Sequence, residues 1–229
     1  LDDASTDDSR AVIEEYASRY PNIKTSFNTV NSGSPFAQWN KGVEMARGEY
    51  IWLAESDDFC EPDFLEKLVP MLRENPNVGI AYSQTYLVDE KGEILNSYLK
   101  NFEFLYKTDA WEKDFIKSGH EVCREWLVFH NPIPNASGAL FRKSTYLKAG
   151  MADRSMKLNG DWYLYARMLA LSDLAFKAEH LNYFRVHPHT QRHRARATPL
   201  VYDEMIRINN FIRNEIPGSG EAADKAIAK

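Results

Sequence analysis

The sequence predicts an α/β protein with a mostly parallel sheet that is flanked by helices. In its first half, short apolar runs alternate with segments in which apolar residues recur at helical spacing. Strands and helices that alternate in this way favour right-handed crossovers between parallel strands. The length agrees with this class, because 229 residues, 44% of them hydrophobic, can bury a substantial core.

The first half should contain three helices. The first runs from Ser5 to about Arg19 and is opened by Ser5 and Asp8 in a capping pattern. The second begins at Pro35, which suits a first helical position, and Gly48 follows its end. A third helix is expected at residues 62–74, and strands at residues 23–27, 50–54, 78–88 and 93–95.

The second half is irregular and aromatic at first and becomes regular again further on. We expect helices near residues 109–118 and 120–129, a strand at 139–142, a short helix that ends at Gly150, and a helix at 161–171. Short strands at 174–177 and 183–186 and a final helix at 199–215 should follow. The tail from Pro217 onward is expected to be frayed.

Composition and charge limit the kind of protein this can be. The net charge of -5 argues against general binding to nucleic acid. Two cysteines indicate neither a disulfide framework nor a zinc cluster, and they favour a reducing, cytoplasmic setting. No apolar run approaches the roughly 20 residues that a membrane-spanning helix needs. The chain begins like the end of a strand, so we expect an upstream strand and helix to belong to a longer parent chain.

An acidic turn follows the apolar run at residues 50–54. Glu55, Asp57 and Asp58 come where that strand should end. In an open α/β sheet, ligands bind beyond the carboxyl ends of the strands. Hard carboxylate oxygens suit Mg²⁺ or Mn²⁺, which commonly take one or two protein carboxylates together with substrate phosphates. The alternative is a helix cap, because acids before Pro62 also complement a helix N-terminus.

Acids recur at two other places where a loop should open to solvent, at Asp3 and at Asp161. With the acidic turn, they suggest one cleft assembled from several strand ends. Here the sequence resembles the inverting family 2 glycosyltransferases with the GT-A fold. The resemblance lies in Leu1-Asp2-Asp3-Ala4-Ser5-Thr6-Asp7, Asn31-Ser32-Gly33, Asn40-Lys41-Gly42, Ala46-Arg47-Gly48-Glu49-Tyr50-Ile51, Glu55-Ser56-Asp57-Asp58 and Gly160-Asp161-Trp162, in the family's order over residues 1 to about 190.

The resemblance implies a glycosyltransferase domain at residues 1–190. Residues 1–95 would form its nucleotide-sugar-binding half and residues 96–190 its acceptor and catalytic half. A basic loop, a helix and a tail would follow at residues 191–229. The sequence lacks the family's first strand and helix, whose loop normally helps to hold the nucleotide.

The resemblance also implies how the donor would be held. Asp3, with Asp2 beside it, would meet the nucleobase or ribose, and Lys41 would belong to the same donor site. Asp57 would lie near the ribose or the ion. Asp58 would ligate the divalent metal, Mn²⁺ or Mg²⁺, that bridges the donor diphosphate. The alternative for Asp3 is an acid that favours a helix N-terminus.

Asp161 would be the general base, which takes the proton from the acceptor hydroxyl as that oxygen attacks the anomeric carbon opposite the leaving diphosphate. One displacement of this kind inverts the configuration. The alternative for Asp161 is a cap on the helix that begins at Trp162, and the two roles can coexist.

A cationic segment at residues 187–196 is a second candidate for contact with the diphosphate. His187 resembles a family position that can reach the metal, although an isolated histidine is more often structural. Arg192 and Arg194 could pair with phosphate oxygens from a lid. The alternative is a solvated or membrane-facing basic patch.

Residues 131–137 could shape the sugar pocket, and the tryptophans could stack on sugar faces, although aromatic residues at this density are more often core. The positions concerned are Trp111, Trp126 and Trp162.

The leading hypothesis is a metal-dependent inverting glycosyltransferase that uses a nucleotide-sugar, with UDP the expected carrier. The acceptor could be a carbohydrate, a lipid-linked or a protein-linked molecule, and nucleic acid is not an expected partner. The protein would be cytoplasmic, with possible peripheral contact at the inner face of the membrane. The alternatives are a nucleotidyltransferase and a catalytically silent sugar-nucleotide-binding module of a larger protein.

Overall fold

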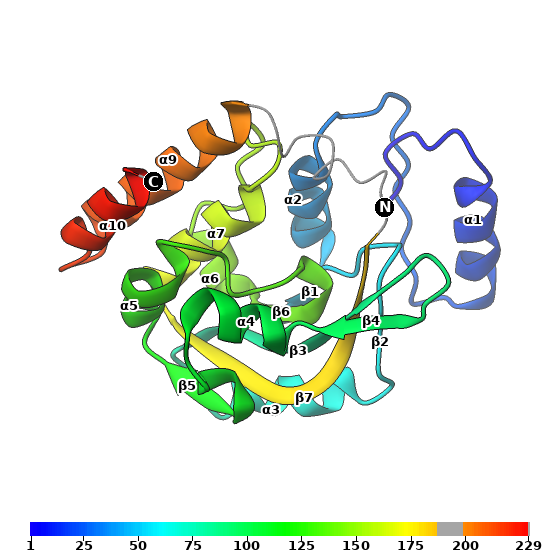
Figure 1. Ribbon diagram of the computed structural model, residues 1–229. Helices are drawn as coiled ribbons and strands as arrows, with labels where there is room; N and C mark the ends of the chain where they lie inside the picture. Colours follow the sequence, from blue (N-terminus) through cyan, green and yellow to red (C-terminus); the bar gives the residue numbers. More distant parts are fainter. Residues whose placement is uncertain (187–198, 229) are drawn as a thin grey trace.

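The computed structural model describes residues 1–186 and 199–228 of the chain. Within this part, a seven-stranded sheet forms the centre of the molecule, with the order β1-β6-β3-β7-β2 and with β4 and β5 paired to β3 and β7 (Figure 1). The strands are β1 (Tyr50–Trp52), β2 (Phe59–Cys60), β3 (Val78–Val88), β4 (Ile94–Ser97), β5 (Phe115–Lys117), β6 (Ala139–Arg142) and β7 (Asp173–Arg185).

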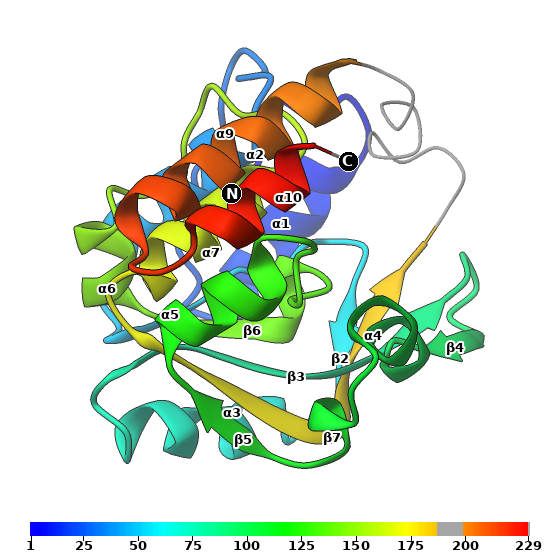
Figure 2. The same ribbon diagram turned by 60° about the vertical axis from the view of Figure 1, so that its left-hand side comes forward.

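Helices cover both faces of this sheet. Helix α3 lies against one face, α4, α6 and α7 lie on the other, and α9 and α10 run side by side beyond α7 (Figure 2). The helices are α1 (Ser9–Arg19), α2 (Pro35–Met45), α3 (Phe64–Arg73), α4 (Leu99–Tyr106), α5 (Gly119–Val122), α6 (Lys143–Lys148), α7 (Gly160–Leu169), α9 (Pro199–Glu215) and α10 (Gly220–Ile227). Short 3-10 turns η1 (Ala110–Glu112) and η3 (Ala136–Gly138) and a π-helical turn η2 (Cys123–Leu127) complete the described elements.

The mostly apolar sequence of β3 is explained by burial on both faces of the sheet. Ile80 and Tyr82 pack into the larger core beneath α7 and η2, whereas Val78 and Ala81 pack against α3 in a second core. Successive strand residues point to opposite faces, so a strand covered on both sides buries successive residues, which here include the polar residues 83–85 in its middle. The α/β class with flanking helices is therefore confirmed.

The prediction of a mostly parallel sheet is wrong for the described strands. Strands β3 and β7 pair in parallel, but β1–β6, β3–β6, β3–β4, β2–β7 and β5–β7 are antiparallel. Because β1 and β3 both run antiparallel to β6, they run in the same direction, as the connection through α3 implies. Strand β6, which comes much later in the chain, lies between them.

Several predicted elements of the first half differ from the structure. Residues 23–27 form no strand, and Phe27 makes only an isolated bridge to Asp2. Helix α1 begins at Ser9 with Asp8 at its N-cap position, so Ser5 does not cap it, and the N–H of Ser5 donates to Asp2 Oδ2 at 3.3 Å.

In the second half of the chain, more of the predicted elements differ from the structure. The region 109–118 contains η1 and β5 in place of a helix, and α4 was not predicted. The two short strands expected at 174–177 and 183–186 are one strand, β7, and the tail expected to be frayed forms α10. The helices near 120–129, 161–171 and 199–215 are confirmed as α5 with η2, α7 and α9. The division of the chain at residues 95 and 190 stays a prediction.

No helix in the described part of the chain combines the length and apolar character that crossing a membrane would need. The three tryptophans proposed for sugar stacking lie in the larger core, with exposed fractions of 1% to 7%. Trp111 donates from its ring nitrogen to the Tyr82 hydroxyl at 2.6 Å. Their bulk therefore packs the sheet against the helices.

Candidate functional site

The acidic turn after β1 is held in place through Asp58. Its Oδ2 atom accepts hydrogen bonds from Asn135 Nδ2 at 2.6 Å and from Ser137 Oγ at 2.8 Å. Its Oδ1 atom accepts the backbone N–H of Arg185 at 3.0 Å. The turn after β1, the η3 region and the end of β7 are thereby joined at one carboxylate.

The groups that hold Asp58 are themselves fixed by buried contacts. Asn182 Nδ2, on β7, donates to Asn135 Oδ1 at 2.8 Å and to Thr85 Oγ1 at 3.1 Å. Ser137 Oγ also accepts the backbone N–H of Glu55 at 3.0 Å. Because buried polar groups are costly unless they are paired, this network specifies one arrangement of the turn.

Negative charge is concentrated at this turn. Burial raises the pKa of Asp58, although the bonds from Arg185, Ser137 and Asn135 oppose the rise. Burial, followed by the negative charges of Asp58, Asp57 and Asp161, raises the pKa of Glu55 to about 8. The carboxylate of Asp161 therefore lies near enough to the turn to act on it electrostatically.

Asp161 is the second residue of α7, whose N-cap position is Asn159. Asn131 Nδ2 donates to Asp161 Oδ2 at 3.2 Å. The Asn131 side chain is itself oriented, because its Oδ1 accepts the N–H of Ile133 at 3.1 Å. An acid at this position also complements the positive end of the helix dipole. Asp161 is half-buried, and it can stabilise the start of α7 while its charge also acts on Glu55.

Asp3 forms a second polar centre near the start of the chain. Its Oδ1 accepts from Asn28 Nδ2 at 2.7 Å, from the N–H of Ser32 at 2.9 Å and from Gln38 Nε2 at 2.9 Å, and its Oδ2 accepts from Ser32 Oγ at 2.7 Å. Burial would raise the pKa of Asp3, but the bonds from Ser32 and Asn28 and the charge of Lys41 bring it below its ordinary value. Since Oδ1 already accepts three bonds, Oδ2 is the oxygen with room for a further donor.

The structure brings Lys41 to this same centre and turns Asp2 away from it. Lys41 Nζ, on α2, donates to Asn28 Oδ1 at 2.7 Å, so Asn28 bridges the ammonium and the Asp3 carboxylate. Asp2 is buried, with an exposed fraction of 6%, and its carboxylate accepts the N–H of Ser5.

The end of β7 closes the acidic turn from the other side. Arg185 Nε donates to the carbonyl oxygen of Asp57 at 2.8 Å, and its Nη1 donates to the carbonyls of Asp89 and Glu90, each at 2.8 Å. The predicted site residues His187, Arg192 and Arg194 lie outside the described residues, so their roles stay predictions.

The residues of the acidic turn fit a hard divalent cation. Their carboxylate oxygens are the donors that Mg²⁺ and Mn²⁺ prefer, and the negative charges of Asp57 and Asp58 add to burial in raising the pKa of Glu55. No group of three or more His, Cys, Asp or Glu side chains within residues 1–186 and 199–228 is arranged to hold an ion. Beside a substrate phosphate, Mg²⁺ commonly takes only one or two protein carboxylates.

Some of these groups were not identified from the sequence. Residues 131–137 were predicted to shape the sugar pocket, but not to hold Asp58 through Asn135 and Ser137. The partners of Asp3 are polar residues of the loop after residue 27 and of α2, and only the run Asn31-Ser32-Gly33 drew attention to them.

An acidic turn at the strand end, an acid on a facing helix and a polar centre on the first loop define a protein of the glycosyltransferase type. A family model described as glycosyl transferase family 2 matches residues 1–135. The chain belongs to this family.

Curated relatives agree with this assignment. An uncharacterized glycosyltransferase of Methanocaldococcus jannaschii is 28% identical over 170 residues, which is 74% of this chain and 52% of that protein. An uncharacterized glycosyltransferase of Haemophilus influenzae is 26% identical over 190 residues, which is 82% of this chain and 55% of that protein. The chain thus spans about half the length of the curated relatives it matches.

The fold is also similar to that of a solved structure. The S. aureus protein TarS, residues 1–349 in complex with UDP, superposes with a TM-score of 0.69 at 17% identity, over 99% of this chain and 58% of that one. This likeness confirms the GT-A type of α/β fold.

Proposed function

We propose that this chain transfers a sugar from a nucleoside diphosphate sugar, with UDP as the carrier, to an acceptor hydroxyl by a single displacement with inversion. The observation that carries the proposal is that Asp161, from α7, and Asp58, from the turn after β1, are bound by Asn131 and Asn135 of one short loop, and the charge of Asp161 also acts on Glu55. The similar TarS structures were solved in complex with UDP and with UDP-GlcNAc, which supports a UDP-sugar donor.

In this mechanism Asp161 acts as the general base. A carboxylate oxygen of Asp161 accepts the proton of the acceptor hydroxyl while the acceptor oxygen bonds to the anomeric carbon. The bond from that carbon to the diphosphate oxygen breaks on the opposite face, and its electron pair leaves with the diphosphate. Asn131 fixes the orientation of the carboxylate through its bond to Oδ2.

The remaining residues hold the donor. Asp3 Oδ2 would accept a hydrogen bond from the nucleoside, and Lys41 would contribute positive charge to the same centre. Asp58, with Asp57 beside it, would hold Mn²⁺ or Mg²⁺. Such an ion, when bound, stabilises the negative charge that develops on the leaving diphosphate.

A carbohydrate polymer is the class of acceptor that we propose. Two relatives have names that point to this class, although each matches only a part of the chain. The Bacillus spizizenii poly(ribitol-phosphate) beta-glucosyltransferase is 37% identical over 75 residues, which is 33% of this chain and 12% of that protein. The Escherichia coli chondroitin synthase is 30% identical over 96 residues, which is 42% of this chain and 14% of that protein.

The change of Asp161 to asparagine tests the base assignment. We expect the rate of UDP release from UDP-GlcNAc or UDP-glucose, with Mn²⁺ present, to fall by about 10²- to 10⁴-fold, because the proton acceptor is lost. Binding of UDP, measured by calorimetry, should stay within about twofold of the wild type, because Asp161 does not hold the donor. Asp224→Asn, the same change at an exposed position of α10, is the matched control. A wild-type rate for Asp161→Asn would contradict the assignment.

A further inference from the structure

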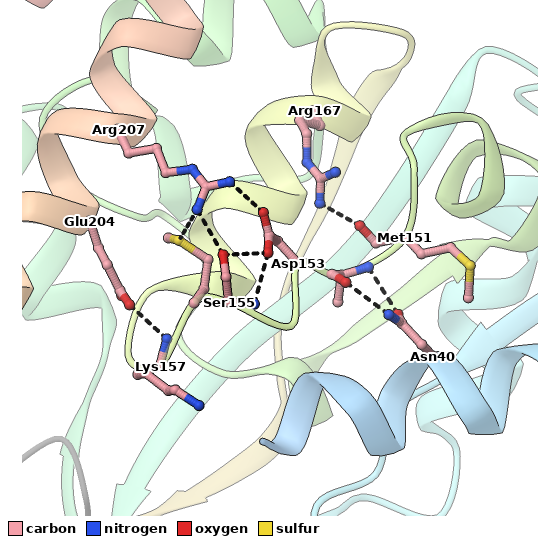
Figure 3. Close-up of polar contacts among 10 residues, drawn as sticks. Asn40, Met151, Asp153, Ser155, Lys157, Arg167, Glu204 and Arg207 are labelled. Atoms are coloured by element: carbon pink, nitrogen blue, oxygen red, sulfur yellow. Dashed lines mark hydrogen bonds and ion pairs between the residues drawn. The ribbon is translucent and has the colours of Figure 1, made fainter. Parts of the chain in front are cut away.

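Helix α9 holds the loop at residues 151–159, which leads directly into α7 (Figure 3). The contact is made by Glu204, a carboxylate with an exposed fraction of 5%. Its Oε1 accepts the backbone N–H of Lys157 at 2.6 Å. Its Oε2 accepts the N–H groups of Leu158 at 3.1 Å and Asn159 at 2.7 Å. One side chain thereby binds three successive backbone groups immediately before the helix that carries Asp161.

Glu204 binds the segment that leads into α7, up to and including its N-cap residue. The N–H groups at a helix N-terminus have no partners within the helix and are commonly bound by the side chain at the N-cap position. The N-cap residue Asn159 makes no such side-chain bond. Glu204 binds the N–H of Asn159 itself and of the two residues before it, and its negative charge complements the helix dipole. A carboxylate this deeply buried is tolerated because all these bonds are made to its charged form.

A second residue of α9 holds the same loop further upstream. Arg207 Nη2 donates to Asp153 Oδ2 at 2.5 Å, and its Nη1 donates to Ser155 Oγ at 2.9 Å (Figure 3). The guanidinium also lies over the ring of Tyr163, on α7, at 5.0 Å from the ring centre. The ring of Phe211 meets that of Tyr163 edge-on, at 5.7 Å between centres. Helix α9 is thus fixed to the loop and to α7 together.

The other end of the loop is fixed from α2. Asn40 Nδ2 donates to the carbonyl oxygen of Ala152 at 2.8 Å, and Asn40 Oδ1 accepts the N–H of Ala152 at 2.9 Å. Asn40 thus holds the loop near its beginning, and Glu204 holds it at its end, directly before α7.

We propose that Glu204 is a positioning residue for Asp161. By holding the three N–H groups before α7, its carboxylate sets the distance between Asp161 and the acidic turn of Glu55 and Asp58. This inference rests on the proposed function, because it takes Asp161 as the general base. It also makes α9, which the sequence suggested was an extension beyond residue 190, a part of the catalytic unit.

The test compares Glu204→Gln with Glu215→Gln, the same change at an exposed position of the same helix. Glutamine keeps one acceptor oxygen but turns a donor toward N–H groups that need an acceptor. We expect kcat for UDP release from UDP-GlcNAc or UDP-glucose to fall by about ten- to a hundredfold, because misplacement of a catalytic group by about 1 Å has effects of this size. The donor KM should stay within about twofold, because α9 does not hold the donor. Hydrogen exchange, followed by mass spectrometry on the full-length protein, should become faster in peptides that cover residues 153–161 and stay unchanged elsewhere.

An unchanged kcat for Glu204→Gln would overturn the proposal, whether or not exchange in the loop becomes faster. A fall in kcat with faster exchange throughout the chain would indicate general destabilisation and would overturn it as well. If Glu204→Gln does not fold, Arg207→Gln takes its place, because the Arg207 side chain is 45% exposed and its loss should be tolerated. It should show the same lower kcat at unchanged KM, and a wild-type kcat would reject the proposal.

The two hypotheses fail in distinguishable ways. A wild-type rate for Asp161→Asn rejects the base assignment and this inference with it. Loss of activity in Asp161→Asn, together with a wild-type kcat in Glu204→Gln, rejects only the role of Glu204.

Discussion

The change of Asn135 to alanine would measure how much a buried amide stabilises the acidic turn. Asn135 donates to Asp58 at 2.6 Å and accepts from Asn182 at 2.8 Å. A hydrogen bond to a charged group contributes about 1.5–3 kcal/mol and one between neutral groups about 1 kcal/mol. The variant should therefore lose about 3 kcal/mol of unfolding free energy. In a protein of this size, that loss corresponds to a decrease in Tm of about 6–12 °C.

Urea unfolding followed by circular dichroism measures this loss. Asn214→Ala, at an exposed position of α9, serves as the control and should change the unfolding free energy by less than about 0.5 kcal/mol. Asn135→Ala should also raise the pKa of Asp58, because it removes one of the hydrogen bonds that oppose the effect of burial. Binding of UDP with Mn²⁺ would then be lost at a higher pH than in the wild type as the solution is acidified. A loss below about 1 kcal/mol would refute the stabilising role of this network.

Two further predictions concern Glu55 and Gly160. Because the pKa of Glu55 is raised from 4.5 to about 8, the stability that its proton contributes is complete below pH 4.5 and is lost as the pH rises through 8. The uncharged variant Glu55→Gln should therefore gain Tm relative to the wild type between about pH 5 and about pH 8.5 in EDTA, and a constant difference would contradict the assigned pKa. A Cβ atom at Gly160 would lie 2.4 Å from the Phe36 ring, so Gly160→Ala should lose about 1–3 kcal/mol in urea unfolding. At Gly220 a Cβ atom would meet nothing within 4 Å, so an equal effect of Gly220→Ala would show that steric conflict is not the cause.

The elements that were predicted correctly are those with local signals. Pro35 starts α2, and the mostly apolar sequence of β3 reflects burial on both faces of the sheet. The order of the strands has no local signal, because β6 pairs with β1 and β3 although it follows them by more than fifty residues. Strand β7 was divided into two in the prediction because its middle is polar, and the structure supplies the reason. Lys177 and Glu179 make ion pairs at the surface, and the His180 ring stacks on Tyr86 at 4.0 Å between centres.

For the candidate site, too, the sequence predicts only what has a local signal. The acids at positions 3, 57, 58 and 161 were identified from the sequence because carboxylates cluster at strand ends and match family motifs. Their supports could not be identified in this way. The partners of Asp58 lie 77, 79 and 127 residues further along the chain, at Asn135, Ser137 and Arg185. Glu204 lies 45 to 47 residues beyond the N–H groups that it binds. Contacts at such separations depend on the strand order and on where α9 packs.

The chemistry of these supports bears on what the acids can do. Within the described residues, Asp58 is bound by an amide, a hydroxyl and a backbone N–H, all of them neutral groups. The guanidinium of Arg185 is directed to the carbonyl oxygens of Asp57, Asp89 and Glu90. At Asp3, the hydrogen bond of Lys41 is likewise made to the amide of Asn28, which in turn donates to the carboxylate. Neutral donors orient a carboxylate without cancelling its charge, whereas a direct ion pair would leave less negative potential for a cation. Held by these neutral groups, the ionised carboxylate of Asp58 keeps the charge that the proposed divalent ion would need, and so its supports favour the proposed metal binding.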